Sequence, residues 1–208
     1  MTRLVLIRHG EAQAYLDNIV AGEKGCRGLS DLGRRQATAL HERLERTGEL
    51  ADTTALYASI LPRAIETAAI IAPAIGGHEI EQDCDFCELH PGEADGMTWD
   101  DYRATYWMEP WDPERAMAPG GESFVGFVER VGAALRRLVE RHPDDTVVIG
   151  CHGGVVMSSM FNALSVPIGD RKFLNGPENT SITEWQIDGD HWGLVRYNDH
   201  AHLADLPD

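Results

Sequence analysis

Short apolar runs recur along the chain and predict the strands of a sheet. Leu4–Ile7 and Thr146–Cys151 are almost unbroken apolar runs, which are typical of strands buried on both faces. Two further short strands are predicted at Thr53–Ala58 and His78–Gln82. A hairpin at a sheet edge is predicted near the end of the chain, where two strand-like segments flank a turn: Ser181–Ile187, Asp188-Gly189-Asp190 and Trp192–Tyr197.

Apolar residues at helical spacing lie between these strands. One helix opens with the capping pair Ser30-Asp31 and stops at Gly48, and another begins at Pro62, which suits a first helical turn. A long helix follows Glu122, and another follows His152. The apolar residues of the long helix belong to the core: Phe124, Phe127, Val128, Val131, Leu135, Leu138 and Val139.

Two segments lack a regular period. Residues Ala12 to Gly28 read as a loop over the end of the first strand. Thr98 to Gly121 is rich in tryptophan, tyrosine and proline, too irregular for one amphipathic helix and too apolar for a flexible tail. We predict a single domain over residues 1–208, in which residues 98–121 form a lid-like insertion.

Composition limits the possible partners. The chain has 208 residues, 43% of them hydrophobic, and a formal net charge of −16, which argues against nucleic acid or an anionic membrane surface. No export signal and no membrane-spanning run is present, so the cytoplasm is the expected location. The four cysteines are expected to be thiols. An anionic substrate then needs a local cationic pocket.

Arg8-His9-Gly10 follows the first strand, where ligands of open α/β sheets bind. A histidine can attack phosphorus through one ring nitrogen when the other is held as a donor, and a neighbouring guanidinium neutralises phosphoryl oxygens. The alternative is an ordinary hydrogen-bonded histidine at a strand end. On these three residues alone the two interpretations are even.

Two further strand ends carry groups that suit an anion. Arg63 lies at the predicted start of a helix after the second strand, where a guanidinium adds to a helix end that already favours anions. His152-Gly153-Gly154 follows Thr146–Cys151 and leads into another helix. An exposed arginine is the plain alternative for Arg63. Its position after a strand, like that of Arg8, favours convergence on one crevice.

Glu88 follows the predicted strand at His78–Gln82 and lies beside Phe86 and Leu89. Apolar neighbours favour a protonated carboxyl, although a solvated loop glutamate is the simpler interpretation from composition. The same stretch contains Cys84 and Cys87 with His90 three residues on. Zinc sites normally need a second ligand pair, and none follows, so no metal site is predicted.

Together these motifs resemble the histidine phosphatase superfamily, which contains the phosphoglycerate mutases. The resemblance extends over about Leu4 to Leu164. Five ordered motifs are far more specific than any one of them. They are Arg8-His9-Gly10-Glu11, Leu29 to Ala37, Ser59 with Arg63, Glu66, Thr67 and Ala68, Glu88 before Gly92 and Gly96, and Cys151-His152-Gly153-Gly154.

The resemblance implies a phosphoglycerate mutase-like fold, a three-layer α/β/α sandwich around a mostly parallel sheet. It also implies that His9 is the phosphorylated nucleophile and that Glu88 protonates the leaving oxygen. Arg8, Arg63 and His152, the last counted among the catalytic residues, would hold the phosphoryl group, with Gly153 beside them. The arginines supply the positive charge, so no cofactor or metal is expected.

Many members of the family have an asparagine soon after the Arg-His-Gly motif. Here Asn18 fits that place only with a shifted loop, so its role in phosphate binding stays open.

Three functions remain in view. We prefer a metal-independent phosphomonoesterase that acts on a small phosphorylated metabolite. The alternatives are a phosphoglycerate mutase and a non-catalytic module that binds phosphorylated ligands. Hydrolysis is favoured over the mutase because Glu88 to Glu122 contains only Arg103 and Arg115 as cations, and because residues 198–208 have no Lys or Arg. A homodimer is compatible with the sequence.

Overall fold

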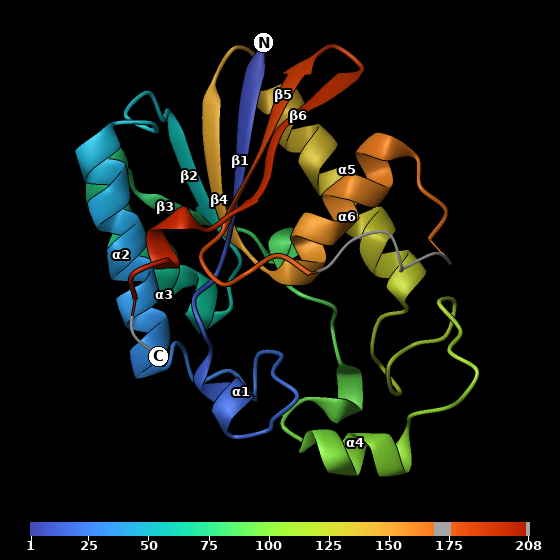
Figure 1. Cartoon of the computed structure of the whole chain (residues 1–208). Coiled ribbons are helices and arrows are strands. Elements are labelled where there is room, and N and C mark those ends of the chain that lie inside the picture. Colours follow the sequence, from blue (N-terminus) through green and yellow to red (C-terminus); the bar gives the residue numbers. More distant parts are fainter. Residues whose placement is uncertain (169–175, 207–208) are drawn as a thin grey trace.

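A six-stranded sheet forms the middle of the molecule, in the order β3-β2-β4-β1-β5-β6 (Figure 1). The computed structural model describes residues 1–168 and 176–206. β1, β2, β3 and β4 run parallel, whereas β5 is antiparallel to both β1 and β6. The strands are β1 (Thr2–Arg8), β2 (Ala55–Ala58), β3 (Ile80–Gln82), β4 (Thr146–Cys151), β5 (Ile182–Asp188) and β6 (His191–Asp199).

The register of the central strands brings three strand ends to one edge of the sheet. Arg8 at the end of β1 lies opposite Cys151 at the end of β4. Ala58 at the end of β2 lies opposite Gly150, on the other side of β4. Because parallel strands all point the same way, the residues that follow them leave the sheet together. This is the arrangement that the strand-end motifs predicted.

Helices cover both faces of the sheet, as Figure 1 shows. α2 (Asp31–Thr47) and α3 (Pro62–Ile71) pack on the face that carries Val5 and Ile7. α5 (Phe124–Arg141) and α6 (Gly153–Leu164) pack on the opposite face, against Leu4 and Leu6. β1 is therefore buried on both sides. The predicted three-layer α/β fold with a mostly parallel sheet is confirmed.

Local signals in the sequence set the helix ends. The Ser30 side chain accepts a hydrogen bond from the Gly33 amide at 3.0 Å, and Gly48 ends α2 with a left-handed φ of 63°. Pro62 occupies the first turn of α3. The Ser123 side chain caps α5 by accepting from the Gly126 amide at 3.1 Å. α5 therefore begins two residues after the predicted Glu122.

The predicted loop from Ala12 to Gly28 is wrong in one respect, because it contains the short helix α1 (Gln13–Leu16). A single turn is too short to give a periodic apolar pattern. α4 (Trp99–Thr105) lies within residues 98–121. The two segments pack on each other through a small apolar cluster, away from the sheet (Figure 1), and its buried members are Val20, Ala94, Tyr102 and Ala118.

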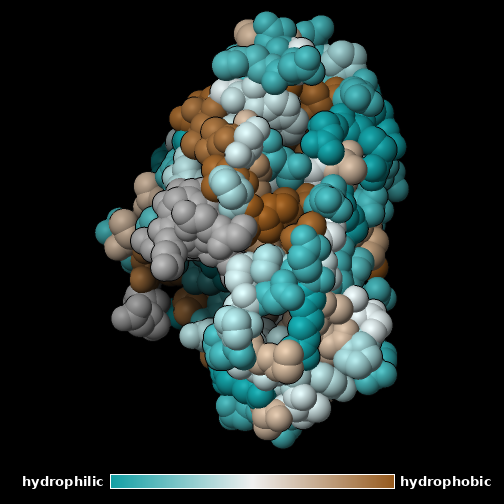
Figure 2. Space-filling view, turned by 90° about the vertical axis from the view of Figure 1, so that its right-hand side faces the viewer, coloured by the Kyte–Doolittle hydropathy of each residue, from teal (hydrophilic) through white to brown (hydrophobic). Residues whose placement is uncertain are grey.

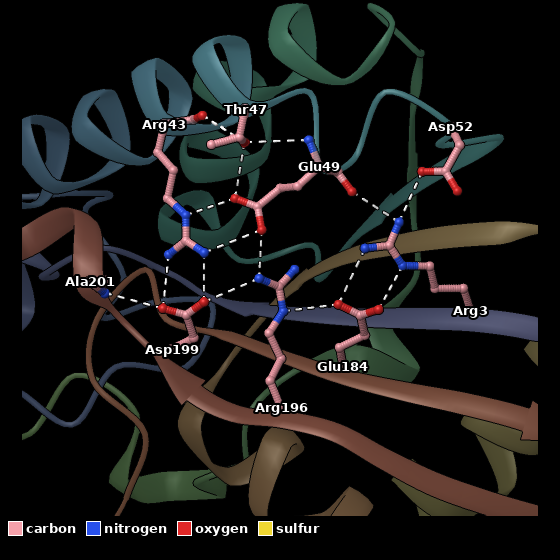
Figure 3. Close-up of polar contacts among 9 residues, drawn as sticks. All are labelled: Arg3, Arg43, Thr47, Glu49, Asp52, Glu184, Arg196, Asp199 and Ala201. Carbon is pink, nitrogen blue, oxygen red and sulfur yellow. Dashed lines mark hydrogen bonds and ion pairs between the residues drawn. The ribbon is translucent and has the colours of Figure 1, made fainter.

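The C-terminal hairpin is tied to the first helix layer by an ion-pair network (Figure 3). Arg43 on α2 contacts Glu49 at 2.7 Å and Asp199 at 2.6 Å. Arg196 on β6 contacts Glu49 at 2.6 Å and Glu184 on β5 at 2.9 Å. The network joins elements far apart in sequence, and these side chains are largely buried. Glu184 also accepts a hydrogen bond from Arg3 on β1.

The hairpin turn and the remaining short elements complete the fold. Gly189, with a φ of 57°, lies in the turn between β5 and β6, as the sequence predicted. Figure 2 shows a largely hydrophilic face in which hydrophobic residues gather in the upper half. No helix in the described part of the chain is long and apolar enough to span a membrane. The 3₁₀ helices are Ala72–Ile75, Cys84–Phe86, Gly92–Ala94 and Ala201–Leu203.

Candidate active site

The residues that follow β1, β2 and β4 meet at the carboxyl edge of the sheet. The His9 amide donates to the Cys151 carbonyl at 2.9 Å, and the Ser59 amide donates to the Gly150 carbonyl at 3.0 Å. The rings of His9 and His152 lie edge to face, with centroids 5.1 Å apart. All three side chains are buried. The convergence expected of Arg8-His9 and His152 is therefore present.

The hydrogen bonds of His9 define one tautomer. Its Nδ1 lies 2.6 Å from the Gly10 carbonyl oxygen, which can only accept, so Nδ1 carries the proton. Arg63 Nε donates to Nε2 at 3.1 Å, so Nε2 presents a lone pair. Burial, followed by the charges of Arg63 and Arg8, lowers the pKa of His9 well below its usual value. The free imidazole is thus neutral and aims a nucleophilic nitrogen at Arg63.

Two guanidinium groups, of the buried Arg63 and the half-buried Arg8, stand beside this nitrogen. Arg63 donates to the Ala21 carbonyl at 3.0 Å, which fixes the arginine against the loop after β1. Arg8 donates to the Pro177 carbonyl. Burial lowers the pKa of Arg8, and its Nε has no partner among the described residues. A half-buried guanidinium whose buried Nε has no acceptor in the described part of the chain favours an anion that accepts from it.

His152 is linked through the Ser59 hydroxyl to the Cys87 thiol. Its Nε2 lies 2.8 Å from the Ser59 hydroxyl, and that hydroxyl donates to Cys87 Sγ at 3.2 Å. Its Nδ1 is buried without a partner in the described part of the chain. Burial, followed by the charge of Arg63, lowers the pKa of His152 well below its usual value. Because the Ser59 hydroxyl gives its proton to Cys87, it accepts from His152 Nε2, and Nδ1 of the neutral ring carries a lone pair.

Glu88 is held at the start of α6. Its Oε2 accepts a hydrogen bond from the Gly154 amide at 3.0 Å. A Cβ at position 154 would lie only 2.0 Å from Glu88 Oε1, so the carboxylate can approach this close only because residue 154 is a glycine. The predicted acid and the predicted anion-binding helix start are thus in direct contact.

Asn179 also supports His9, and sequence analysis did not identify it. Its side-chain amide donates to the His9 carbonyl at 3.0 Å. β5 is antiparallel to β1, so the residues before β5, rather than those after it, reach this edge. A rule that searches strand carboxyl ends misses such a residue. Asn18, whose role was open, is exposed and donates to Asp100 at 3.3 Å.

A cavity of about 900 Å³ opens from this cluster toward the insertion. Arg8, Arg63, Glu88 and Gly153 line one part of it. The other part is mainly aromatic and belongs to the insertion and to α5 and α6, including Trp99, Tyr102, Tyr106, Trp107, Trp111, Phe124 and Phe161. A charged end and an aromatic end suit a phosphate ester whose other half is less polar.

The Cys84-Cys87-His90 motif lies beside the site without lining this cavity. Its ligand atoms, two sulfurs and one ring nitrogen, all lie within 4.8 Å of one another. All four cysteines are free thiols in the structure, as the sequence predicted. The sequence lacks a second ligand pair, yet the fold brings these three ligand atoms close together.

Comparison with known proteins gives a consistent result. Residues 4–200 match the family model of the histidine phosphatase superfamily (branch 1). The chain is 31% identical to phosphoglycerate mutase-like protein 4 of Arabidopsis thaliana, covering 97% of this chain and 87% of the relative. It is 27% identical to the metal-independent phosphoserine phosphatase of the same plant, covering 99% and 85%.

A solved structure shows the same fold with a similar level of identity. The mycobacterial glucosyl-3-phosphoglycerate phosphatase, in complex with VO3, superposes with a TM-score of 0.77 at 28% identity. The match covers 95% of this chain and 99% of that one.

Proposed function

Since this chain belongs to the histidine phosphatase superfamily and is a phosphomonoesterase, we propose that it acts through a phosphohistidine on His9. The observation that carries the proposal is the fixed tautomer of His9. With Nδ1 committed to a main-chain carbonyl, only Nε2 can attack phosphorus. The phosphoenzyme is then the 3-phosphohistidine isomer.

In the first half-reaction, the Nε2 lone pair forms the N–P bond while the bond from phosphorus to the leaving oxygen breaks. Arg8 and Arg63, which line the cavity, bind the phosphoryl oxygens, where negative charge is stabilised best by preorganised donors. His152 joins them when the phosphate dianion favours its protonated form, because only then can its Nδ1 donate. Gly153, at the start of α6, offers its amide. Glu88 lines the same cavity and donates a proton to the leaving oxygen.

In the second half-reaction, water attacks the phosphohistidine and the N–P bond breaks. Glu88, now a carboxylate, takes a proton from that water, so one residue serves both steps. His9 returns to the neutral tautomer that the Gly10 carbonyl and Arg63 maintain. Free phosphate then leaves. The cations of the site carry the charge, so we expect turnover to persist in EDTA.

Replacing Glu88 tests the assignment of the acid. Glu88→Gln should slow the hydrolysis of alkyl phosphates by on the order of 10²–10⁴-fold. Aryl phosphates should be affected much less, because their leaving oxygen needs little protonation. Glu93→Gln, an exposed carboxylate of the same segment, is the control and should leave both classes unchanged. Equal losses on alkyl and aryl esters in Glu88→Gln would remove the acid role.

Trapping tests the nucleophile in the same proteins. Wild type quenched during turnover should carry acid-labile, base-stable phosphate, and His9→Ala should carry none. An acid-stable phosphoenzyme would contradict the assignment of His9.

The insertion at residues 98–121 is proposed to act as a lid that selects the leaving group. Trp107 and Trp111 both line the cavity, and Trp107 is 46% exposed. Relatives are named for phosphoserine and for glucosyl-3-phosphoglycerate, and both compounds are phosphate esters of small alcohols. We propose a small alkyl phosphate whose leaving group has an apolar face.

Replacing both lid tryptophans with alanine tests this selection. The ranking of substrates in a phosphometabolite panel should change more than the melting temperature does. If only thermal stability falls, the two residues belong to the core and select nothing.

Hydrolysis is proposed over mutase activity because the cavity has few cations beyond the phosphoryl site. Arg115 lines the cavity, whereas Arg103 pairs with Asp100 on the exposed side of α4. The second argument from the sequence is wrong: the C-terminal residues described, 198–206, do not line this cavity. With 3-phosphoglycerate and catalytic 2,3-bisphosphoglycerate we expect slow phosphate release. Rapid formation of 2-phosphoglycerate would establish the mutase instead.

Two expectations about the setting of the protein remain predictions. The free thiols favour a reducing compartment such as the cytoplasm. A homodimer would most simply use the edge strand β6, which exposes Leu194 and Val195. Light scattering on the purified protein decides the second.

A further inference from the structure

We propose that Cys84, Cys87 and His90 form a binding site for Zn²⁺, separate from the phosphate-binding cavity. The three residues occur at every third position, on the 3₁₀ turn Cys84–Phe86 and just after it. Their two sulfurs and one ring nitrogen lie within 4.8 Å of one another. Thiolate and imidazole are the ligands that zinc prefers in proteins.

The spacing of these atoms fits a tetrahedral ion. Bond lengths of about 2.3 Å for Zn–S and about 2.0–2.1 Å for Zn–N place a sulfur and a nitrogen on one ion about 3.5–3.6 Å apart. Cys84 Sγ and His90 Nε2 are separated by 3.6 Å. Two sulfurs on the same ion lie about 3.8 Å apart. The cluster therefore needs only a small closing movement to enclose zinc.

The neighbours of the cluster support this role. Cys84 Sγ faces His90 Nε2. The other ring nitrogen, Nδ1, lies 3.9 Å from Glu122 Oε2. Zinc-bound histidines characteristically have such a carboxylate partner on their other nitrogen. Arg130 pairs with Glu122 at 2.8 Å and donates to the carbonyls of Cys84, Asp85 and Cys87. One arginine thus holds both the turn and the carboxylate.

Solvent can complete the coordination of the ion. Binding of Zn²⁺ would release both thiol protons to solvent and form two Zn–S bonds. A second cavity, of about 280 Å³, is lined by Cys87 and His90 and can supply a water as the fourth ligand.

The position of the site gives it a structural task. Its three ligands flank Glu88, so the ion would fix the segment that carries this residue. It would supply no chemistry to phosphoryl transfer, because none of the three ligands lines the 900 Å³ cavity. The metal site stands independently of the proposed function, since zinc binding is measured without substrate.

Cobalt substitution tests the site. The full-length protein is reduced, stripped with a chelator and titrated with Co²⁺. One equivalent should give a thiolate-to-cobalt charge-transfer band and the strong visible absorption of tetrahedral cobalt, both removed by Zn²⁺. C84S and C87S should lose the charge-transfer intensity. Their zinc dissociation constants should rise by at least about 100-fold, more than the about 10–100-fold that loss of an outer partner costs.

Cys26 provides the matched control, because it packs in the same apolar cluster as Cys87 but lies outside the group of ligand atoms. C26S should keep the cobalt spectrum and the zinc affinity. Circular dichroism of each variant checks that it is folded. Absence of the band in reduced wild type, its retention in C84S, or its loss in folded C26S would each overturn the proposal. Wild type that binds no zinc and instead forms a Cys84–Cys87 disulfide in air would also do so.

Discussion

At the scale of single residues, the contact between Glu88 and Gly154 shows how closely the position of the proposed acid depends on the start of α6. The Gly154 amide donates to Glu88 at 3.0 Å. A Cβ on residue 154 would collide with the Glu88 carboxylate, at 2.0 Å from Oε1. Gly153, one position earlier, is different. A Cβ there would lie 3.6 Å from Arg8 Nε, an ordinary contact.

Gly154→Ala should therefore displace the Glu88 carboxylate and lower kcat for alkyl phosphates by on the order of 10²-fold, as misplaced catalytic groups do. Gly153→Ala should cause a much smaller loss, because its new methyl group meets no atom closer than 3.6 Å. Steady-state kinetics of the two variants measures the difference. Equal losses would show that the first turn of α6 as a whole, rather than the position of Glu88, limits the rate.

Sequence reasoning found the residues of the site that follow parallel strands and missed those that do not. His9 and His152 were expected because parallel strand ends collect ligands at one edge. Asn179 was missed because it precedes an antiparallel strand. Ser59 appeared in a motif, but its contacts with His152 and Cys87 depend on tertiary structure. Hydrogen bonds between side chains far apart in the sequence produce no periodic pattern that sequence analysis could detect.

At the scale of elements, the network in Figure 3 holds the C-terminal hairpin against α2. Arg43 donates two hydrogen bonds to the carboxylate of Glu49 and two to that of Asp199. Its side chain is 13% exposed. Removing it would leave Glu49 and Asp199 to share Arg196 as their cation in a partly dry environment. Arg34 on the same helix also contacts two carboxylates, but its side chain is 49% exposed.

Arg43→Met should lower the free energy of unfolding by about 1.5–3 kcal/mol, since its hydrogen bonds to charged partners are partly buried. Arg34→Met should cost less than about 1 kcal/mol, because exposed pairs are screened by water. Urea denaturation at neutral pH measures both. A similar small loss in the two variants would mean that the network adds little beyond an ordinary surface pair.

Helices with capping residues and long apolar periods were predicted well, as were the short strands β2 and β3, whereas the short helices were not. α2 begins and ends where Ser30 and Gly48 indicated. α1 was missed because one helical turn carries no period. The aromatic residues of the insertion gave no regular pattern because they pack on the loop after β1 and line a cavity. Their arrangement follows from tertiary contacts, which a local pattern does not contain.

At the scale of the whole molecule, buried neutral histidines make stability depend on pH. Burial is the first cause that lowers the pKa of His9 and His152, and it lowers the pKa of His202 to about 4. In the unfolded chain each histidine takes up a proton near about pH 6.5. Below that pH the unfolded state binds more protons than the folded state. Stability therefore falls as pH falls from about 6.5 toward 4.

The urea midpoint should accordingly be lower at pH 5 than at pH 7, and His202→Gln should reduce the difference. Paired carboxylates add to this loss only at the acid end of the range, because the lowered pKa values of Glu49 and Glu122 begin to cost stability as pH falls toward 4.5. The hydrogen bond from Arg43 lowers the pKa of Asp199, so the stability it contributes is lost only below the usual value of about 3.9. An identical pH dependence in wild type and His202→Gln would exclude His202 as a contributor.

The strand order has a consequence for biosynthesis. β1, which His9 follows, is made first, yet its two neighbours in the sheet, β4 and β5, lie at residues 146–151 and 182–188. At a ribosomal rate of about 5–20 residues per second, the first strand waits on the order of ten seconds or more for its partners. Until then its apolar faces have no sheet to join. The nascent chain therefore carries the histidine proposed as its nucleophile long before the sheet that positions it can form.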